Sequence, residues 1–220
     1  MDGMTEHSEP KPYDVEQPVA AGRDEVWDAV TQPPVLRQWF GWDHDGLDHE
    51  IQQIFVDEAT LTSPERMGWP DSSFLEVTGD DDRSTVRAVR IGDPAADPVA
   101  FDAMEEGWRV FLAQLRFLLE ERPEGLRRTV HLTGSARGRG VLALADGEAL
   151  PLGTRTAQVM TADGQLVLVS GHEPLDSPEA GRIEVVVSTF GLGDDAFAEV
   201  RDDWTQRWAA LAREAVVTVA

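Results

Sequence analysis

Two amphipathic helices at a fixed separation constrain the fold of this chain more than any other feature. Residues 101–121 and 195–214 predict these helices, because their large apolar residues recur three or four positions apart. The second set follows the first by 96 residues at every position, pairing Phe101, Met104, Trp108, Leu112 and Leu115 with Phe197, Val200, Trp204, Trp208 and Leu211. An apolar helix face has to be covered, so we expect each helix to bury its stripe against a sheet.

The constant register indicates an internal repeat. A strand ending in glycine precedes each helix, at residues 86–92 and 185–191, which supports a repeated strand–helix unit. The alternative is coincidence, since any two amphipathic helices can be aligned by their stripes. Acidic Asp102, Glu105 and Glu106 lie in the first turns of the earlier helix, where the helix dipole favours them.

The rest of the first half alternates short helices and strands. A strand is predicted at 13–19, a helix at 23–31, and a second helix that Pro34 opens and Gly41 ends. Runs rich in β-branched and aromatic residues then predict strands at 50–55, 58–62, 73–78 and 84–91.

The second half is shorter and repeats only the closing part of this plan. Strands are predicted at 129–133 and 182–190, with a hairpin of 157–162 and 165–170 around Asp163-Gly164 between them. Residues 137–146 stand where the paired short helices would be, but their glycines make them a poor helix. The fold class predicted is therefore α+β.

Charge excludes several classes of partner. The chain has 220 residues and a net charge of −22, with 28 acidic against ten basic residues in 1–125 and 13 against nine in 126–220. Such a field repels phosphate backbones, so neither nucleic acid nor an anionic membrane is an expected partner. The acidity of the first half indicates either plain solubility or a basic protein partner.

Composition sets further limits. No cysteine is present, which excludes disulfides, thiolate metal sites and cysteine nucleophiles. No apolar run reaches the length of a membrane span, and residues 1–12 are polar and acidic, unlike a secretory signal. We expect a disordered tail over residues 1–12 and a cytoplasmic protein.

The segment VEQPVAAGRDEVWDAVTQPPVLRQWFG, residues 15–41, resembles the opening of bacterial domains related to the Hsp90 ATPase activator homologue. These domains belong to the START/Bet v 1-like (SRPBCC) superfamily. The matching motifs are Val26-Trp27, Leu36 and Trp39-Phe40-Gly41, followed by Pro64-Glu65-Arg66-Met67, Ser84-Thr85-Val86 and Gly107-Trp108. The likeness covers about 13–122 and is much weaker over 127–220. The family's Gly-Gly loop is absent from residues 46–55.

The resemblance implies a helix-grip domain at 13–122, in which a curved antiparallel sheet wraps a long C-terminal helix around a cavity. A shorter, degenerate copy would follow at 127–220. Relatives with this fold bind sterols, lipids, polyketides or other apolar molecules, and some act as chaperone partners or as cyclases and aromatases. Fold alone does not choose among these functions.

Large apolar residues are the candidates for lining that cavity. The alternative is that they fill a solid core, which we favour for Trp27 and Trp39. The set proposed to line the cavity is Trp39, Trp42, Trp69, Trp108, Phe111 and Leu115.

Polar candidates for the cavity are few. His44, His49 and Arg109 are the groups that an acid–base enzyme of the cyclase or hydrolase sort could use. The surrounding cluster of Asp43, Asp45 and Asp48 matches no ligand spacing, so we expect a solvated acidic loop and no metal site. No serine elbow, Walker motif or full dinucleotide fingerprint is present, and neither a catalytic residue nor a cofactor is predicted.

Three functions stay open at this point. The first is non-catalytic binding of a small apolar ligand, such as a lipid or polyketide. The second is a protein-interaction or chaperone-associated module with a basic partner. The third is a cyclase- or aromatase-like enzyme. The sequence does not predict the oligomeric state.

Overall fold

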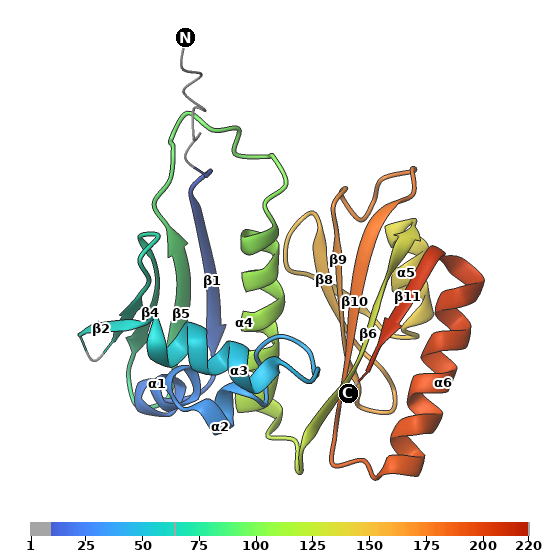
Figure 1. Cartoon of the computed structure of the whole chain (residues 1–220), viewed down its shortest axis with the longest axis horizontal. Coiled ribbons are helices and arrows are strands. Elements are labelled where there is room, and N and C mark those ends of the chain that lie inside the picture. Colours follow the sequence, from blue (N-terminus) through green and yellow to red (C-terminus); the bar gives the residue numbers. More distant parts are fainter. Residues whose placement is uncertain (1–9, 64, 220) are drawn as a thin grey trace.

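The protein has an α+β fold built on two antiparallel sheets, each accompanied by one long helix (Figure 1). The structure is a computed structural model and describes residues 10–63 and 65–219. The tail predicted over residues 1–12 falls mostly outside these residues, as does Pro64. Residues 10–12 are placed, and the amide of Asp93 donates to the carbonyl of Pro10 at 3.0 Å.

The first sheet belongs to the first half of the chain. Its strand order is β1 (Tyr13–Val19), β5 (Ser84–Arg90), β4 (Ser73–Gly79), β3 (Arg66–Gly68) and β2 (Thr60–Ser63). β1 and β5 pair from Tyr13 with Arg90 to Val19 with Ser84. Buried and exposed residues alternate strictly along β1, as a sheet with only one covered face requires. The accompanying helices are α1 (Arg23–Thr31), α2 (Pro33–Leu36), α3 (Leu47–Gln52), the π-helical turn η1 (Gln53–Asp57) and α4 (Ala103–Glu121).

The second sheet contains six strands. Their order is β11 (Arg213–Thr218), β6 (Arg127–Ala136), β10 (Gly181–Phe190), β9 (Leu166–Gly171), β8 (Thr156–Met160) and β7 (Ala149–Pro151). α5 (Gly138–Leu144) and α6 (Asp194–Leu211) pack on one face of this sheet. Phe197, Trp204 and Trp208 are the residues of α6 buried in that core.

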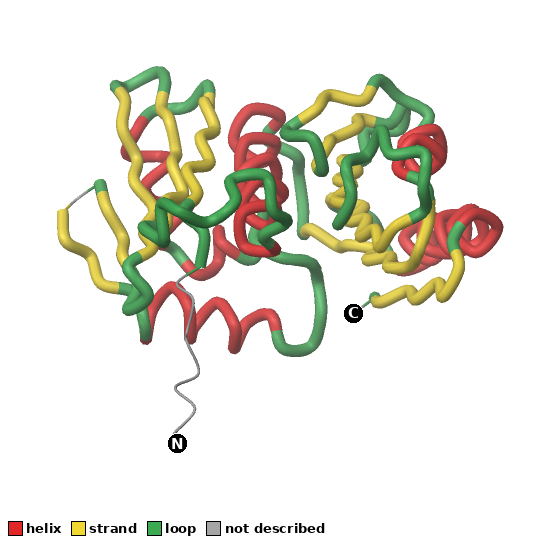
Figure 2. Tube along the Cα trace, turned by 90° about the horizontal axis from the view of Figure 1, so that it is seen from above, coloured by secondary structure: helices red, strands yellow, loops and turns green. Residues whose placement is uncertain are grey.

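α4 lies between the two sheets and is apolar on both of its sides (Figures 1 and 2). One side places Trp108, Leu112, Leu115 and Leu119 in the core of the first half. The other side places Val110 and Ala113 against residues of β9. A charged stripe separates these two apolar sides, with the ion pairs Glu105–Arg109 and Arg116–Glu120 four residues apart.

β9 is the strand of the second sheet that packs against α4 on one face and against the core under α6 on the other. Its residues Leu166, Val167, Leu168 and Val169 are all buried. Val167 and Val169 point into the core under α6, while Leu166 and Leu168 point to α4. The strand is therefore covered on both faces, which is why its sequence is a continuous apolar run rather than an alternating one.

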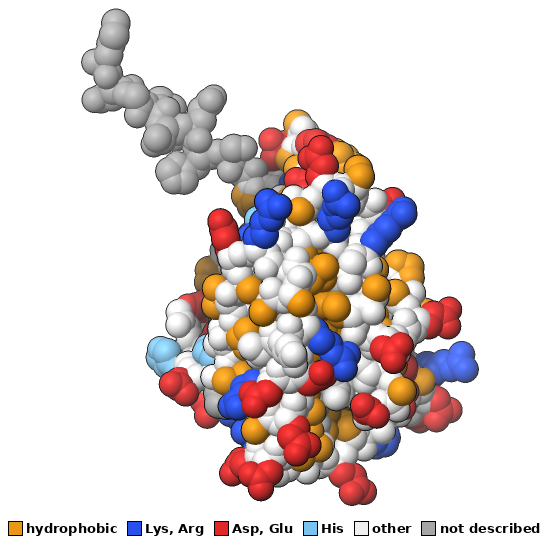
Figure 3. Space-filling model, turned by 90° about the vertical axis from the view of Figure 1, so that its right-hand side faces the viewer, with side chains coloured by type: hydrophobic (Ala, Val, Ile, Leu, Met, Phe, Trp, Pro, Cys, Tyr) orange, Lys and Arg blue, Asp and Glu red, His pale blue; other side chains and the backbone are white. Residues whose placement is uncertain are grey.

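The surface of the second half carries charges of both signs. Figure 3 shows Lys or Arg side chains interspersed with Asp and Glu over the face that includes α6. This mixture of charges is expected from the composition of residues 126–220, which include nine basic and 13 acidic residues.

Three segments differ from the sequence-based predictions. Residues 50–55 are helical in α3 and η1, because Leu47, Ile51 and Phe55 are buried at a spacing of four. The last helix ends at Leu211 rather than near residue 214, and residues 213–218 form β11 on the edge of β6. Residues 138–144 form the helix α5 despite their glycines.

Gly138 is required in α5 by a close backbone approach. A Cβ at this position would lie 2.4 Å from the carbonyl oxygen of Leu175, far inside van der Waals contact. The glycine that lowers helix propensity therefore also lets α5 pack against the segment that follows β9.

A buried guanidinium joins the two halves. Arg127, the first residue of β6, donates to the carbonyl oxygens of Phe40 at 3.1 Å and Gly41 at 2.7 Å. It also donates to Gln114 Oε1 on α4 and to Ser188 Oγ on β10. Desolvation by burial lowers the pKa of Arg127 to about 9, against the opposing effect of the Asp43 carboxylate. These acceptors replace the water that the cation loses.

We expect Trp108→Ala to destabilise the protein by about 3–5 kcal/mol, because it would empty a site that is only 5% exposed. Chemical denaturation measures this loss. Met104→Ala on the same helix is the matched control, since Met104 is 53% exposed and its truncation should cost about 0.5 kcal/mol or less. Equal losses for the two variants would contradict the packing of α4.

Arg127→Met should destabilise the protein by about 2–4 kcal/mol, because the carbonyl of Phe40 and the amide oxygen of Gln114 would lose a buried donor. Arg128→Met is the control on the same strand. Arg128 pairs with the exposed Asp194 at 2.9 Å and lies over the ring of Phe197, at 4.0 Å from its centroid, so its loss should cost about 1 kcal/mol. Denaturant titration of both variants would refute the role of Arg127 if the two curves coincided.

Candidate functional site

A pocket of about 420 Å³ lies between α4 and the second sheet. The first half contributes Trp42, Phe101 and one side of α4, and the second half contributes residues of β9 and β10 and the turn after β9. Its volume is within the range of small-molecule sites, which are concave and mostly apolar with a few placed polar groups.

The α4 wall is made by residues at helical spacing. Ala103, Glu106, Gly107, Val110 and Phe111 recur every three or four positions and face the pocket together. Gly107 leaves part of this wall bare. A Cβ built there would meet only ring atoms of Phe111, at 3.6 and 3.8 Å, which is ordinary contact. The backbone of α4 is therefore directly accessible from the pocket at this position.

The opposite wall follows the period of a β-sheet. Leu168 and Ser170 of β9 and Arg182, Glu184 and Val186 of β10 are separated by two residues along each strand. Side chains at this spacing point to the same face of a sheet. The face is the one turned to α4, so the wall is a direct consequence of the docking of the two halves.

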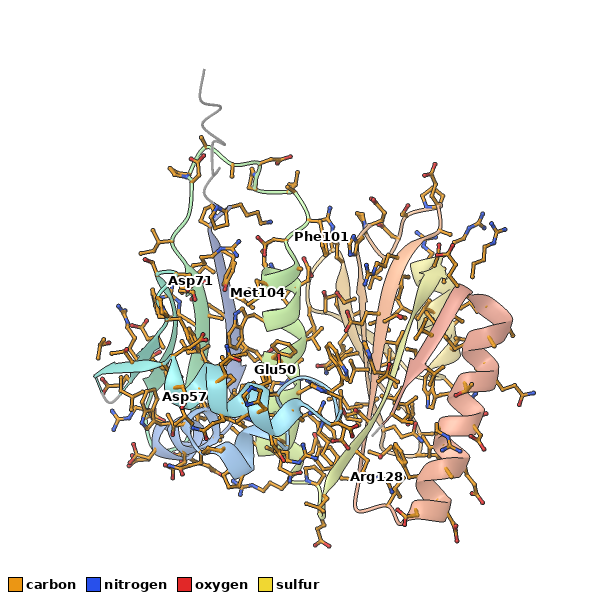
Figure 4. All side chains as sticks on the ribbon, viewed as in Figure 1. Glu50, Asp57, Asp71, Phe101, Met104 and Arg128 are labelled. Atoms are coloured by element: carbon orange, nitrogen blue, oxygen red, sulfur yellow. The ribbon has the colours of Figure 1, made fainter. Side chains whose placement is uncertain are left out.

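Two stacked pairs of rings join the halves at the pocket. Trp42 stacks on His131 of β6, with ring centroids 4.1 Å apart and an angle of 14° between the planes. Phe101 stacks on His172, with centroids 3.9 Å apart and an angle of 22°. In each pair the larger aromatic ring comes from the first half and the imidazole from the second. Figure 4 shows Phe101 at the upper end of α4, on the side of the second sheet.

Phe101 is held in place by charged contacts of the loop that precedes α4. The ammonium group of Lys11 donates to the carbonyls of Pro98 at 3.1 Å and Ala100 at 2.7 Å, and pairs with Glu105 at 2.7 Å. Asp102 accepts the amides of residues 104 and 105, each at 3.0 Å, as the N-cap of α4, and it also pairs with the buried Arg90.

Glu106 is the buried carboxylate of the pocket. Its side chain is 9% exposed, and Oε2 accepts a hydrogen bond from the hydroxyl of Thr156 on β8. Arg109 Nε lies 3.7 Å from the same oxygen and makes no hydrogen bond with any residue that the structure describes. Within residues 10–63 and 65–219, Thr156 donates to Oε2 and no donor reaches Glu106 Oε1, which unlike Arg109 Nε is in contact with solvent. One carboxylate oxygen is therefore left for a donor from outside the chain.

The second carboxylate lies on the facing strand. Glu184 Oε1 is 2.7 Å from His131 Nε2, and the imidazole of this histidine is the one stacked on Trp42. Arg182, two residues earlier, is exposed at the edge of the pocket. The polar lining thus combines two acids with one exposed base and the imidazole of His172.

Of the apolar residues predicted to line a cavity, the structure brings Trp42 and Phe111 to this pocket. Trp39, Trp108 and Leu115 lie in the packed core between α4 and the first sheet, and Trp39 Nε1 donates to the carbonyl of Ala29 at 2.9 Å. Trp69 packs against the same core and donates to Ile54. The pocket is therefore on the side of α4 opposite to the sheet that the sequence indicated.

The polar candidates lie outside the lining. His44 Nδ1 accepts the amide of Gly46 at 3.1 Å, so its Nε2 carries the proton that is directed to Glu50 at 3.2 Å. His49 is exposed on α3. Arg109 stands behind Glu106 and pairs with Glu105 at 2.7 Å.

Sequence reasoning missed Phe101, Glu106, Gly107, His172 and Glu184 as pocket residues. One signal could have indicated them. The continuous apolar run of β9 requires a second covering element, and α4 has apolar residues on two sides rather than one. Polar residues and glycines on the facing surfaces of α4 and the second sheet would then have been candidates for a site.

Within the described part of the chain, no three or more His, Cys, Asp or Glu residues are grouped so that they could hold a metal ion. Among the same residues, no helix is both long and apolar enough to span a membrane.

No protein-family model matches this chain, and no curated protein is significantly similar to it. Three solved structures are similar. DynU16, from the dynemicin biosynthetic locus, is 18% identical, with a TM-score of 0.36 over 91% of this chain and 96% of its own. The di-domain ARO/CYC BexL, from the BE-7585A biosynthetic pathway, is 13% identical, with a TM-score of 0.37 over 90% and 96%. The di-domain ARO/CYC StfQ, from the steffimycin biosynthetic pathway, is 13% identical, with a TM-score of 0.35 over 89% and 90%. Likenesses at this level assign no activity to the chain.

The stack of Phe101 on His172 should stabilise the association of the two halves. In a double-mutant cycle of Phe101→Ala and His172→Ala, we expect a coupling energy of about 0.5–1.5 kcal/mol, the usual range for a ring pair. Equilibrium denaturation of the two single variants and the double variant measures it. Strictly additive losses would contradict a direct contact between these rings.

Proposed function

We propose that this protein binds a small, largely apolar molecule with a flat ring in the pocket between α4 and the second sheet. The observation that carries this proposal is the composition of the pocket. Trp42, Phe101 and Phe111 offer aromatic surface, and apolar residues such as Val110 and Leu168 complete the walls. Flat rings gain most from such surfaces, through stacking and edge-to-face contacts.

Binding without chemistry is favoured by two of the ionisable side chains in the lining. Glu184 is occupied by His131, and the imidazole of His172 is stacked on Phe101. The histidines that the sequence offered for acid–base catalysis, His44 and His49, do not line the pocket. A lipid or a polyketide belongs to the class of ligand proposed, and a cyclase-like activity is the alternative that the same pocket would serve.

The narrower resemblance to the Hsp90 ATPase activator homologue stays a prediction. It rests on sequence motifs of the first half, and no family model supports it. A chaperone-associated role would use an acidic outer surface and a basic partner, neither of which involves the pocket.

Gly107→Leu should weaken ligand binding without damaging the fold. The new side chain would project from the bare stretch of α4 into the pocket, and leucine forms helix better than glycine. Titration with N-phenyl-1-naphthylamine, a neutral apolar fluorophore, measures occupancy. We expect affinity in Gly107→Leu to fall at least about tenfold, which corresponds to about 1.4 kcal/mol.

Gly107→Ala is the matched control for this experiment. Its methyl group makes only ordinary contact with Phe111, and it should stabilise α4 by about 0.5–1 kcal/mol. The probe should therefore bind this variant as it binds the wild-type protein. Unchanged binding to Gly107→Leu would exclude the pocket as the site, and native mass spectrometry of the freshly purified protein would show whether a ligand is carried elsewhere.

A further inference from the structure

We propose that Glu106 determines which ligands the pocket accepts, favouring an aromatic molecule that carries a protonated amine and rejecting one that carries a carboxylate. This inference rests on the proposed function, because it concerns the same pocket. It adds the chemical class of the ligand and names the residue that selects it.

The position of Glu106 is the first step of the argument. Its carboxylate is buried in the α4 wall, where Thr156 satisfies Oε2, while Oε1 has no hydrogen bond within the described residues. Oε1 is not among the buried atoms that lack a partner, so solvent reaches it, and a donor group of the ligand can replace that solvent. A charged donor makes a stronger hydrogen bond with a carboxylate than a neutral one. A ligand with an N–H or O–H group directed to Oε1 is therefore bound more tightly than one without it.

The sign of the surrounding charge is the second step. Glu184 places another carboxylate on the facing wall, so an anionic ligand meets one acid on each side. Arg109 neutralises the negative charge of Glu106 only in part, because it also pairs with Glu105 at 2.7 Å. The charge of Arg182 is screened by solvent, because this side chain is exposed at the edge of the pocket. The whole chain adds a net charge of −22, which attracts cations and repels anions over longer distances.

The aromatic walls point to the same class of ligand. Trp42, Phe101 and Phe111 present rings to the pocket, and the faces of such rings attract ammonium groups. An aromatic amine can therefore place its ring among these side chains and direct its charge to Glu106. An aromatic carboxylate or alcohol can make the same ring contacts. The carboxylate lacks both the cation–π contact and the pairing with Glu106, and the neutral alcohol can offer Glu106 only a hydrogen bond.

Three probes with one ring system test the inference. They are 1-naphthylmethylamine, 1-naphthalenemethanol and 1-naphthoate, titrated calorimetrically at neutral pH. We expect the order amine, alcohol, acid in the wild-type protein, with at least about a tenfold difference between the amine and the acid. In Glu106→Gln this difference should shrink to about threefold or less, while the affinity for the alcohol stays similar, because glutamine keeps an acceptor of the same shape.

Glu121→Gln is the matched control. It removes the same charge from the exposed C-terminal end of α4, away from the pocket, so the order and the ratios should be those of the wild-type protein. A loss of discrimination in this variant as well would assign the effect to the net charge of the chain and would overturn the role of Glu106.

The remaining outcomes separate the two proposals. Equal affinity for the three probes in the wild-type protein overturns the inference even if Glu106→Gln does not fold, and it leaves the proposed function standing. A discrimination that survives in folded Glu106→Gln overturns it too. If neither these probes nor N-phenyl-1-naphthylamine binds the wild-type protein, the proposed function itself fails.

Discussion

The buried guanidinium of Arg127 is the interaction on which the arrangement of this molecule depends. A cation without water needs acceptors on several sides, and here they come from three separate parts of the chain: residues 40–41, α4 and β10. No one of these parts can supply the acceptors alone. The requirement to satisfy a single side chain therefore fixes how the first half meets the second. A further contact, from the amide of Asp43 to Thr129 Oγ1 at 2.6 Å, lies beside it.

The shared use of α4 follows from this junction. Once the halves are docked, the helix that closes the first core also covers the open face of the second sheet. A helix with two apolar sides cannot leave either of them in water without a large loss of buried surface. The space left where the two surfaces do not match, beside Gly107, is the pocket. The site is thus a property of the interface and of neither half alone.

This origin explains what the sequence could and could not predict. Periodicity identified the strand at 13–19, the helix at 23–31 and the body of both long helices, because each buries one face on a local neighbour. The sequence-based prediction failed at residues 50–55, where β-branched and aromatic residues indicated a strand although the buried residues have a spacing of four, and at residues 213–218, where an edge strand follows a helix directly. The acid at Glu106 was explained by the helix dipole, and only the docked second sheet shows that it faces a pocket.

The two walls of the pocket and the loop that carries Phe101 are held by different kinds of interaction. The walls belong to a helix packed in two cores and to central strands of a sheet, which are the most stable parts of a fold. The loop that carries Phe101 is held by Lys11, the only lysine of an acidic chain. The Lys11–Glu105 pair is largely buried, with side chains 9% and 15% exposed, so salt screens it less than an exposed pair. The shape of the pocket is therefore set by apolar packing at its walls and by a few largely buried charged contacts at Phe101.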